Sequence, residues 1–477
     1  MTSRYPADSL APRDRATHVL NRLGFGPRPG EVDRLVAEGI DHAVDRLLAA
    51  DGPEPAVDER LKACPRFDHS IDRIVGEHQK MKGMMGSRAP IEGALDDLRS
   101  AKIIRAVHSE HQLREVLVDF WFNHFNVYSY AWEPSVPAYE KEAIRPHVFG
   151  SFRALLGATT THPSMLFFLD NYLNVADRQD KGVLVRGINE NFGRELLELH
   201  TVSVDAKYTQ EDVQAAARAL TGWDFGGWGV YRFTFNPDKH DTEAKRVFGL
   251  DLPAGGGQEE GDRLLDYLAT HPATAQFVSW RLVQRFVADE PPAALVARCA
   301  EVFLATQGDI RSVLKAIFES REFWSAEHVA SKVKTPFEFA VGALRAVDAE
   351  VSDGKGVAVA LGNMGMPLYG CRPPTGYSNR GLSWLSAASQ VHRFDFAFKL
   401  AAGVVPGVAA HPDRLGARAR SVDHAEKLTK AMAAEVLGSR LSKGTREVAS
   451  RFRPSPGVDT LTKVAGLLLA SPEFQMR

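Results

Sequence analysis

Apolar residues recur at three- and four-residue spacing over most of the chain, a pattern that predicts amphipathic helices. Helices are predicted from Ala16 to Leu23 and from Glu31 to Leu48, with a turn at residues 24–27 between them. Ala, Leu, Arg and Glu, which favour helices, are frequent in the helical segments. Alternation of aromatic and polar residues, which is typical of a strand, is clear only from Tyr231 to Phe235. The pattern therefore predicts a mainly α, large multi-helical globular protein with a small β insertion.

Three segments are expected along the chain. Residues 1–78 are predicted to form an N-terminal helical segment, and residues 79–254 a central helical core that carries the candidate site and a short β hairpin. The run of three glycines at 255–257 separates this core from a C-terminal helical region, residues 255–477. A chain of 477 residues is long enough to bury a large core without disulfide or metal staples.

Composition and charge narrow the classes of partner. The net charge is −2, from 58 Lys and Arg against 60 Asp and Glu, so no basic field steers nucleic acid to the surface. Three widely separated cysteines, Cys64, Cys299 and Cys371, exclude a disulfide framework. No apolar run reaches the length of a membrane span, and the first residues lack the apolar core of a signal peptide. We expect a cytoplasmic protein from the chain as given, and an exported one if its N-terminus has been trimmed; the sequence does not specify an oligomeric state.

The most informative stretch for chemistry runs from Asn189 to His200. On a helix, at about 100° per residue, Asn191, Glu195 and Glu198 fall on one face, beside an apolar stripe that includes Leu199. Carboxylates three residues apart have Cβ atoms about 5–6 Å apart, so one can raise the pKa of the other if the face is enclosed. This spacing suits acid–base catalysis, and it also suits neighbouring carboxylate ligands of a metal ion. A solvated face paired with arginine is the alternative interpretation.

The histidine at the end of this stretch can join the carboxylates only if the helix changes. In a continuous helix His200 points away from Glu195 and Glu198, so it turns inward only if the helix ends near Leu199. The β-branched residues that follow favour such an end. A buried, hydrogen-bonded structural histidine is the alternative.

Two further histidines are candidate bases or metal ligands. His124 projects from the apolar side of a predicted helix, so we expect it to be buried with a hydrogen-bond partner, or to serve as a base or ligand. His240 and Asp241 follow the predicted strand, and such a pair can fix an imidazole tautomer or bind a metal through both groups. Turn formation is the alternative for Asp241. The candidate ligands of a divalent metal ion are thus His124, His200, His240 and Asp241.

Local features add structural expectations and possible substrate contacts. Thr209 and Asp212 have the spacing of a helix capping box, and Gly193 permits the close approach of another backbone. Trp223 and Trp384 have flat ring surfaces on which sugar rings could stack, with core packing as the alternative.

Several motifs together resemble a known bacterial family. They are THVLNRLGFGPRPGEV, DFWFNHFNVY, HPSMLFFLDN, NENFGRELLELHTVSVDAKYTQEDVQAAARALTGW, KHDTEAKRVFG and MPLYGCRPPTGY. They are similar to the domain-of-unknown-function family 1800 (DUF1800) over nearly the whole chain. The resemblance implies a largely helical protein whose motif positions are Asn123, His124, Asn189, Glu190, Asn191, Glu195, Glu198, His200, Trp223, His240 and Asp241. Family members often have twin-arginine-type leaders, which this chain lacks, and the family's activity is not established.

Three functional hypotheses follow. The first is a hydrolase acting on a glycoside or polysaccharide, in which Glu195 and Glu198 carry the chemistry and His124 is a third catalytic candidate. Its candidate substrate contacts are Asn123, Asn189, Glu190, Asn191, Trp223 and Trp384. The second is a metal-dependent hydrolase or oxidoreductase with a His/carboxylate centre. The third is a non-enzymatic helical scaffold or binding protein whose polar residues form a buried network. The first two imply a small-molecule or carbohydrate substrate as partner.

Overall fold

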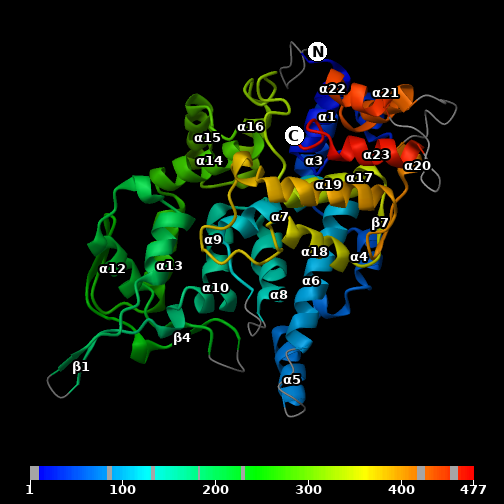
Figure 1. The fold of residues 1–477 in the computed structure, drawn as a ribbon. Coiled ribbons are helices and arrows are strands. Elements are labelled where there is room, and N and C mark those ends of the chain that lie inside the picture. The colour runs from blue at the N-terminus through cyan, green and yellow to red at the C-terminus, as the bar shows by residue number, and fades with distance from the viewer. Residues whose placement is uncertain are drawn as a thin grey trace.

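Helices dominate the structure, a computed structural model that describes residues 10–82, 89–129, 135–180, 183–226, 231–415, 425–451 and 460–477. Within these ranges the chain forms the α-helices α1 to α23 and eight short strands, which pair into four separate two-stranded sheets (Figure 1). The protein is therefore mainly α with small β elements, as the spacing of apolar residues predicts.

Five helices form the N-terminal part: α1 (Pro12–Arg22), α2 (Glu31–Glu38), α3 (Ile40–Ala49), α4 (Pro55–Leu61) and α5 (Ile71–Lys82). The prediction of one continuous helix over residues 31–48 is wrong, because the structure divides this stretch into α2 and α3. Gly39 lies between the two helices with a φ of +93°. Glycine adopts this conformation at low cost, and it commonly ends an α-helix.

The other helices follow in three groups along the chain. The central group is α6 (Ala89–His108), α7 (Gln112–His124), α8 (Val136–Tyr139), α9 (Phe152–Thr160), α10 (Pro163–Phe168), α11 (Asn191–Glu195) and α12 (Gln210–Ala219). The next is α13 (Gln258–Ala269), α14 (Pro272–Phe286), α15 (Ala293–Ala305) and α16 (Ile310–Phe318). The last is α17 (Pro336–Ala346), α18 (Lys355–Asn363), α19 (Ala387–Ala401), α20 (Pro412–Leu415), α21 (Ala425–Val436), α22 (Lys443–Ser450) and α23 (Thr460–Ala470).

Helix α6 lies at the centre of the packing. It contacts α4, α5, α7, α8, α17 and α18, and Figure 1 shows it between the N-terminal helices and α18. Leu98, Ile103, Ile104 and Val107 on α6 are all fully buried, as expected for a helix surrounded by others. Among the residues that the structure describes, neither α6 nor any other helix is long and apolar enough to cross a membrane.

The four sheets are antiparallel pairs: β1 (Arg178–Asp180) with β2 (Val183–Val185), β3 (Trp223–Asp224) with β4 (Thr234–Phe235), β5 (Lys245–Val247) with β6 (Leu250–Leu252), and β7 (Glu350–Val351) with β8 (Val408–Ala409). The first three lie within residues 178–252, around the predicted β insertion. The strand predicted from Tyr231 to Phe235 is shorter than expected, because only its last two residues pair. Tyr231 has a φ of +43°, which is incompatible with an extended strand.

One hydrophobic core joins the three predicted segments. A single cluster of buried apolar side chains extends from Ala16 to Phe474. Helix α3 contacts α16, and α6 contacts α17. Near the chain ends, the Arg13 guanidinium donates a hydrogen bond to the carbonyl oxygen of Ala434 at 2.9 Å. Packing therefore continues across the predicted boundaries after residues 78 and 254.

Candidate functional site

Helix α11, which carries Glu195, lies directly against α12. The N–H of Asn191, its first residue, donates a hydrogen bond to Asn189 Oδ1 at 3.0 Å. A Cβ atom added at Gly193 would lie 2.7 Å from the backbone nitrogen of Ala217 on α12. Glycine at this position therefore lets the two backbones approach closely, as predicted.

The start of α12 is fixed by the predicted capping box. The Thr209 hydroxyl accepts a hydrogen bond from the Asp212 N–H at 3.2 Å, and Asp212 Oδ2 accepts one from the Thr209 N–H at 2.8 Å. This reciprocal arrangement satisfies two backbone donors at the helix end. The helix that supports α11 is thus anchored by its own sequence.

A π-helical turn, η5 (Leu196–His200), continues α11 without a break. Its residues Leu196 and Leu197 are buried, whereas Leu199, which is predicted to lie on the apolar stripe, is only half-buried. The turn ends at Thr201, whose hydroxyl donates a hydrogen bond to the Leu196 carbonyl oxygen at 2.6 Å. The helical segment thus ends one residue after the position expected, and His200, its last residue, is buried. Turns of this kind are rare and are frequently found at functional sites.

Glu195 and Glu198 are half-buried neighbours with different surroundings. Burial and, after it, the negative charge of Glu198 raise the pKa of Glu195. The Tyr208 hydroxyl donates a hydrogen bond to Glu198 Oε2 at 3.3 Å, and burial together with the Glu198 charge raises the pKa of Tyr208 to about 12. One carboxyl group is thus biased toward its protonated form, while the other accepts a hydrogen bond from a neutral hydroxyl.

Tyr208 is a residue that sequence reasoning missed. It lies immediately before the capping box, and its contact with Glu198 spans ten positions along the chain. The available signal is its position just before α12, the helix on which α11 packs. Helical spacing within α11 alone cannot find such a partner.

His124 and His200 are brought together in a buried aromatic environment. They are 2% and 1% exposed, and their ring centroids are 6.4 Å apart. His124 Nε2 lies 3.2 Å from the His200 carbonyl oxygen, so this nitrogen carries the proton and donates it. Burial, followed by the charge of Arg281, lowers the pKa of His124 well below its usual value, and burial lowers that of His200 to about 3. Both imidazoles are therefore neutral, and the predicted burial of His124 with a partner is confirmed.

The predicted polar neighbours on α11 make contacts that hold the helix in place. Glu190 accepts hydrogen bonds from Arg194 at 2.9 Å and from Gln210 at 2.6 Å. Asn191 donates its side-chain N–H to the Leu169 carbonyl oxygen at 3.2 Å. These contacts already use part of the hydrogen-bonding capacity that substrate contacts would need.

Asn123 and Trp384 are tied to a loop near the C-terminal helices. The Asn123 side chain donates to the Tyr377 carbonyl oxygen at 2.8 Å and accepts from the Tyr377 N–H at 2.7 Å. The Trp384 indole N–H donates to the Ser378 carbonyl oxygen at 3.1 Å, and its ring is 8% exposed. Both predicted substrate contacts thus anchor the segment that contains Tyr377 and Ser378.

His240 and Asp241 belong to a buried ionic network. His240 Nδ1 lies 2.8 Å from the Thr221 carbonyl oxygen, and its Nε2 lies 3.3 Å from Glu260 Oε2. Arg218 donates two hydrogen bonds to the Asp241 carboxylate, at 2.7 and 3.0 Å. Although burial opposes the change, these hydrogen bonds lower the pKa of Asp241. The pair is held by protein partners, and Asp241 Oδ1 accepts the Glu243 N–H at 2.9 Å, which fits turn formation, the alternative for Asp241.

Trp223 is completely buried next to this network, at 0% exposure. Its indole ring packs against Gly261 on α13 and against Phe233 at 5.0 Å between centroids. A ring without an exposed face has no surface to offer a sugar. The structure therefore corrects the stacking role predicted for Trp223 in favour of the alternative, core packing.

The four candidate metal ligands do not form one cluster. In the part of the chain that the structure describes, no group of three or more His, Cys, Asp or Glu side chains is placed to hold one ion. His124 and His200 form one pair, and His240 and Asp241 interact with Arg218, Thr221 and Glu260 instead. This arrangement does not form a common His/carboxylate centre from all four residues.

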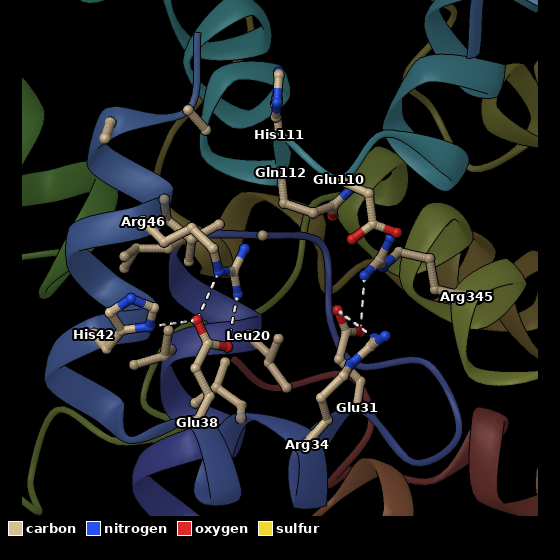
Figure 2. Close-up of a pocket in the computed structure, with 17 residues that line it drawn as sticks. Leu20, Glu31, Arg34, Glu38, His42, Arg46, Glu110, His111, Gln112 and Arg345 are labelled. Atoms are coloured by element: carbon tan, nitrogen blue, oxygen red, sulfur yellow. Dashed lines mark hydrogen bonds and ion pairs between the residues drawn. The ribbon is translucent and has the colours of Figure 1, made fainter. Parts of the chain in front are cut away.

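A large pocket lies in a different part of the molecule. Figure 2 shows this cavity of about 760 Å³, which has leucine side chains from α1, α2 and α3 and charged side chains around them. Arg46 donates to both oxygens of Glu38, at 2.7 and 3.0 Å, and Arg345 donates to Glu31 at 2.9 Å. The Arg46 hydrogen bonds lower the pKa of Glu38. A lowered pKa keeps the Glu38 carboxylate ionised, which suits ligand binding better than proton donation.

Five pockets of the described chain, with volumes from about 230 to about 760 Å³, are lined by none of the predicted site residues. Any substrate of Glu195 and Glu198 would therefore bind outside these five. The half-buried state of both carboxylates leaves part of each side chain open to solvent.

Comparison with known proteins places the chain in a family and identifies no activity. No curated protein and no solved structure is significantly similar to it. Residues 18–476 match the family described as "Protein of unknown function (DUF1800)". Since this match covers almost the whole chain, the protein belongs to the DUF1800 family.

Proposed function

We propose that this protein is a hydrolase that uses Glu195 and Glu198 as an acid–base pair, with a glycoside or polysaccharide as its substrate. The observation that carries the proposal is the unequal environment of two adjacent carboxyl groups on one helical segment. The pKa of Glu195 is raised by burial and by Glu198, and the Tyr208 hydroxyl donates a hydrogen bond to Glu198. Glycoside hydrolysis requires one carboxyl group that donates a proton and a second one that acts as base or nucleophile.

Each residue has a distinct role in this proposal. Glu195 donates its proton to the leaving glycosidic oxygen, which avoids expulsion of an alkoxide. Glu198 acts as the base for a water molecule or as the nucleophile at the anomeric carbon. Tyr208 is a positioning residue, because it orients the Glu198 carboxylate and keeps its own proton up to a pKa of about 12.

The metal-dependent alternative has less support from the donor set. Two neutral imidazoles, His124 and His200, lie together, but the described residues supply no third His, Cys, Asp or Glu at ligand distance. Structural zinc and most catalytic zinc sites use at least three protein ligands. The carboxylate pair is therefore the better basis for a reaction.

The test is turnover on a panel of glycosides and polysaccharides by the full chain and by Glu195→Gln and Glu198→Gln. Each variant is expected to lose activity by about a hundredfold or more, as is typical of an acid or base. Glu211→Gln is a matched control, because Glu211 is an exposed acid on the adjacent helix α12. Hydrolysis that is unchanged in both test variants would disprove the proposal.

The scaffold hypothesis is favoured by a different observation. Asn123, Asn191 and His124 each bind a backbone carbonyl oxygen of a distant segment, as members of a structural network do. If these residues only hold the fold, truncating them lowers the melting temperature and no substrate is turned over. Measuring thermal unfolding beside activity in the glutamate variants separates loss of fold from loss of chemistry.

A further inference from the structure

Helix α19 presents an apolar face to solvent. Its inner side packs against α17, α18 and α23, and Figure 1 shows the helix at the front of the molecule. On the outer side, Val391, Phe394 and Phe398 are 63%, 43% and 44% exposed. Their spacing of three and four residues places these side chains on one face of the helix. A contiguous exposed apolar surface of this kind marks a site of contact with another molecule.

The apolar surface extends beyond the helix itself. Leu382 and Leu385, just before α19, are exposed, and so is Val448 on α22. Phe394, Phe398 and Val448 line a groove of about 460 Å³ between α19, α22 and α23. We call this surface, from Leu382 to Phe398 with the groove beside it, the α19 face.

The area of the α19 face fits a stable protein interface. The exposed leucine, valine and phenylalanine side chains from residue 382 to residue 398 leave on the order of 500 Å² open, within the range of functional patches on monomers. A standard interface buries about 800 Å² on each partner, of which a little more than half is apolar. The α19 face therefore supplies the apolar area that one side of such an interface needs.

The charges around the α19 face balance one another. Asp395 and Lys399, both half exposed, lie on one flank of α19 and form an ion pair at 2.8 Å. On α22, Lys443 and Glu447 are 3.7 Å apart and also have opposite charges. Equal numbers of acids and bases do not favour a strongly charged partner. They also lack the excess of lysine and arginine that attracts a helix to an anionic lipid surface.

The α19 face is complementary to itself. When a two-fold axis relates two antiparallel helices that face each other, the same flank of each helix meets in the pair, and each contact occurs twice. An axis near residues 396–397 places Asp395 of each copy opposite Lys399 of the other. The same axis places Phe394 of each copy opposite Phe398 of the other, where the rings can pack edge to face or offset. Opposite charges and aromatic rings thus meet in one arrangement.

We propose that this protein forms a two-fold symmetric dimer in which the α19 faces of two copies pack antiparallel. Val391, Phe394 and Phe398 form the apolar centre of the interface, and Asp395 and Lys399 form its polar rim. Because the same flanks meet, the grooves of the two copies lie on one side of the interface. The dimer removes the exposed phenylalanine rings from water, which provides the driving force for association.

The first test is sedimentation velocity of the full chain over a wide range of concentrations. A species of twice the chain mass is expected. Phe398→Glu places a charge in the apolar centre and is expected to weaken dimerisation by at least about a hundredfold, because the change occurs twice in a symmetric interface. Leu304→Glu is the matched control, since Leu304 is 41% exposed on α15. That control is expected to dimerise like the parent protein.

Phe398 also packs near Gly466 on α23, so the melting temperature of Phe398→Glu is measured in parallel. Val391→Glu repeats the test at a more exposed position of the same face, where the change affects fewer contacts within one chain. It is expected to weaken dimerisation in the same direction, with the melting temperature of the monomer unchanged.

A second test examines the antiparallel arrangement. Asp395→Lys places two lysines opposite each other at both ends of the contact, which is expected to weaken dimerisation by about tenfold. The double variant Asp395→Lys with Lys399→Asp exchanges the two charges within each helix. Because each charge then again faces its opposite on the other copy, the double variant is expected to recover the affinity of the parent protein.

Several results would overturn the proposal. A monomer at every concentration would do so, as would a dimer that neither Phe398→Glu nor Val391→Glu weakens. A double charge variant as weak as Asp395→Lys would show that the two helices are not antiparallel. A monomer that binds phosphatidylcholine vesicles, and loses this binding in Val391→Glu, would assign the α19 face to a lipid surface instead. These outcomes are separate from the hydrolase assay, because none of the changed residues lies on α11.

Discussion

Tyr208 and Glu198 form a hydrogen bond of 3.3 Å between the phenol oxygen and Oε2, whereas no described residue donates a hydrogen bond to the side chain of Glu195. This asymmetry distinguishes two carboxyl groups that the sequence presents as equivalents on one helical face. It depends on packing of α11 against α12, since Tyr208 precedes the capping box of α12. The packing of α11 on α12 therefore supplies a hydrogen-bond donor to Glu198.

Glu195→Gln is expected to stabilise the protein at pH 7 and to have little effect below pH 4. Burial and the charge of Glu198 raise the pKa of Glu195 in the folded protein. The contribution of Glu195 to the free energy of unfolding is therefore fully present below its unfolded pKa of about 4.3. That contribution is lost as pH rises through the higher folded value. The gain at pH 7 is about 0.5 kcal/mol, because solvent screens this half-exposed group. Urea unfolding at both pH values measures it, and a pH-independent difference would contradict the raised pKa.

Gly193→Ala is expected to destabilise the protein by about 1–3 kcal/mol, the usual range for overpacking. The new Cβ would lie 2.7 Å from Ala217 N and 3.0 Å from Val213 O, which are backbone atoms that cannot rotate away. Gly76→Ala is the control, because Gly76 has no atom within 4 Å of an added Cβ and lies in helix α5. That control is expected to be neutral or stabilising. Equal urea midpoints for the two variants would argue against close packing of α11 on α12.

Local periodicity and capping explain why much of the fold could be predicted. The apolar spacing indicates the helices, Thr209 and Asp212 define the start of α12, and the apolar side of α7 places His124 in the interior. Gly193 indicates a close backbone approach before the partner is known. Each of these features depends on residues within one or two helical turns of each other.

Features that join distant segments could not be predicted in the same way. The contact of Asn123 with Tyr377 spans 254 positions, and the Tyr208 contact depends on how α12 packs. The π-turn η5 is not predicted from the apolar pattern, because that pattern assumes the regular period of an α-helix along the whole segment. The spacing of residues along the chain does not decide whether an aromatic residue such as Trp223 is buried or exposed. These positions are where the predicted site and the observed contacts differ.

Asn123→Asp is expected to destabilise the protein by about 1 kcal/mol, the low end of the cost of an unsatisfied polar group, because Asn123 is half-buried. Aspartate can still accept the Tyr377 N–H, but it cannot donate to the Tyr377 carbonyl oxygen, which lies 2.8 Å from the asparagine nitrogen. A carboxylate facing this carbonyl is repulsive. Thermal unfolding and limited proteolysis near Tyr377 measure the effect. If Asn123 serves only as a substrate contact, the melting temperature of the variant stays at that of the parent protein.

Glu140 is expected to make the protein sensitive to acid. Its carboxylate lies 3.1 Å from Lys102 and 3.2 Å from Arg145, and it is 2% exposed. Although burial opposes the change, Lys102 and then Arg145 lower the pKa of Glu140 to about 2. The stability that Glu140 contributes is therefore present above the unfolded pKa of about 4.3 and is lost as pH falls through the folded value.

Glu140→Gln tests this role, because it leaves the two buried cations without one of their counter-ions. We expect a loss of about 3–5 kcal/mol at pH 7 and a flatter dependence of unfolding free energy on pH between the two pKa values. Glu59→Gln is the control, since Glu59 pairs with Lys62 on the surface with both side chains at least 70% exposed. Its effect is expected to stay below about 0.5 kcal/mol. Urea unfolding across the acid range measures both variants, and parallel pH profiles for the parent protein and Glu140→Gln would show that another carboxylate controls the acid response.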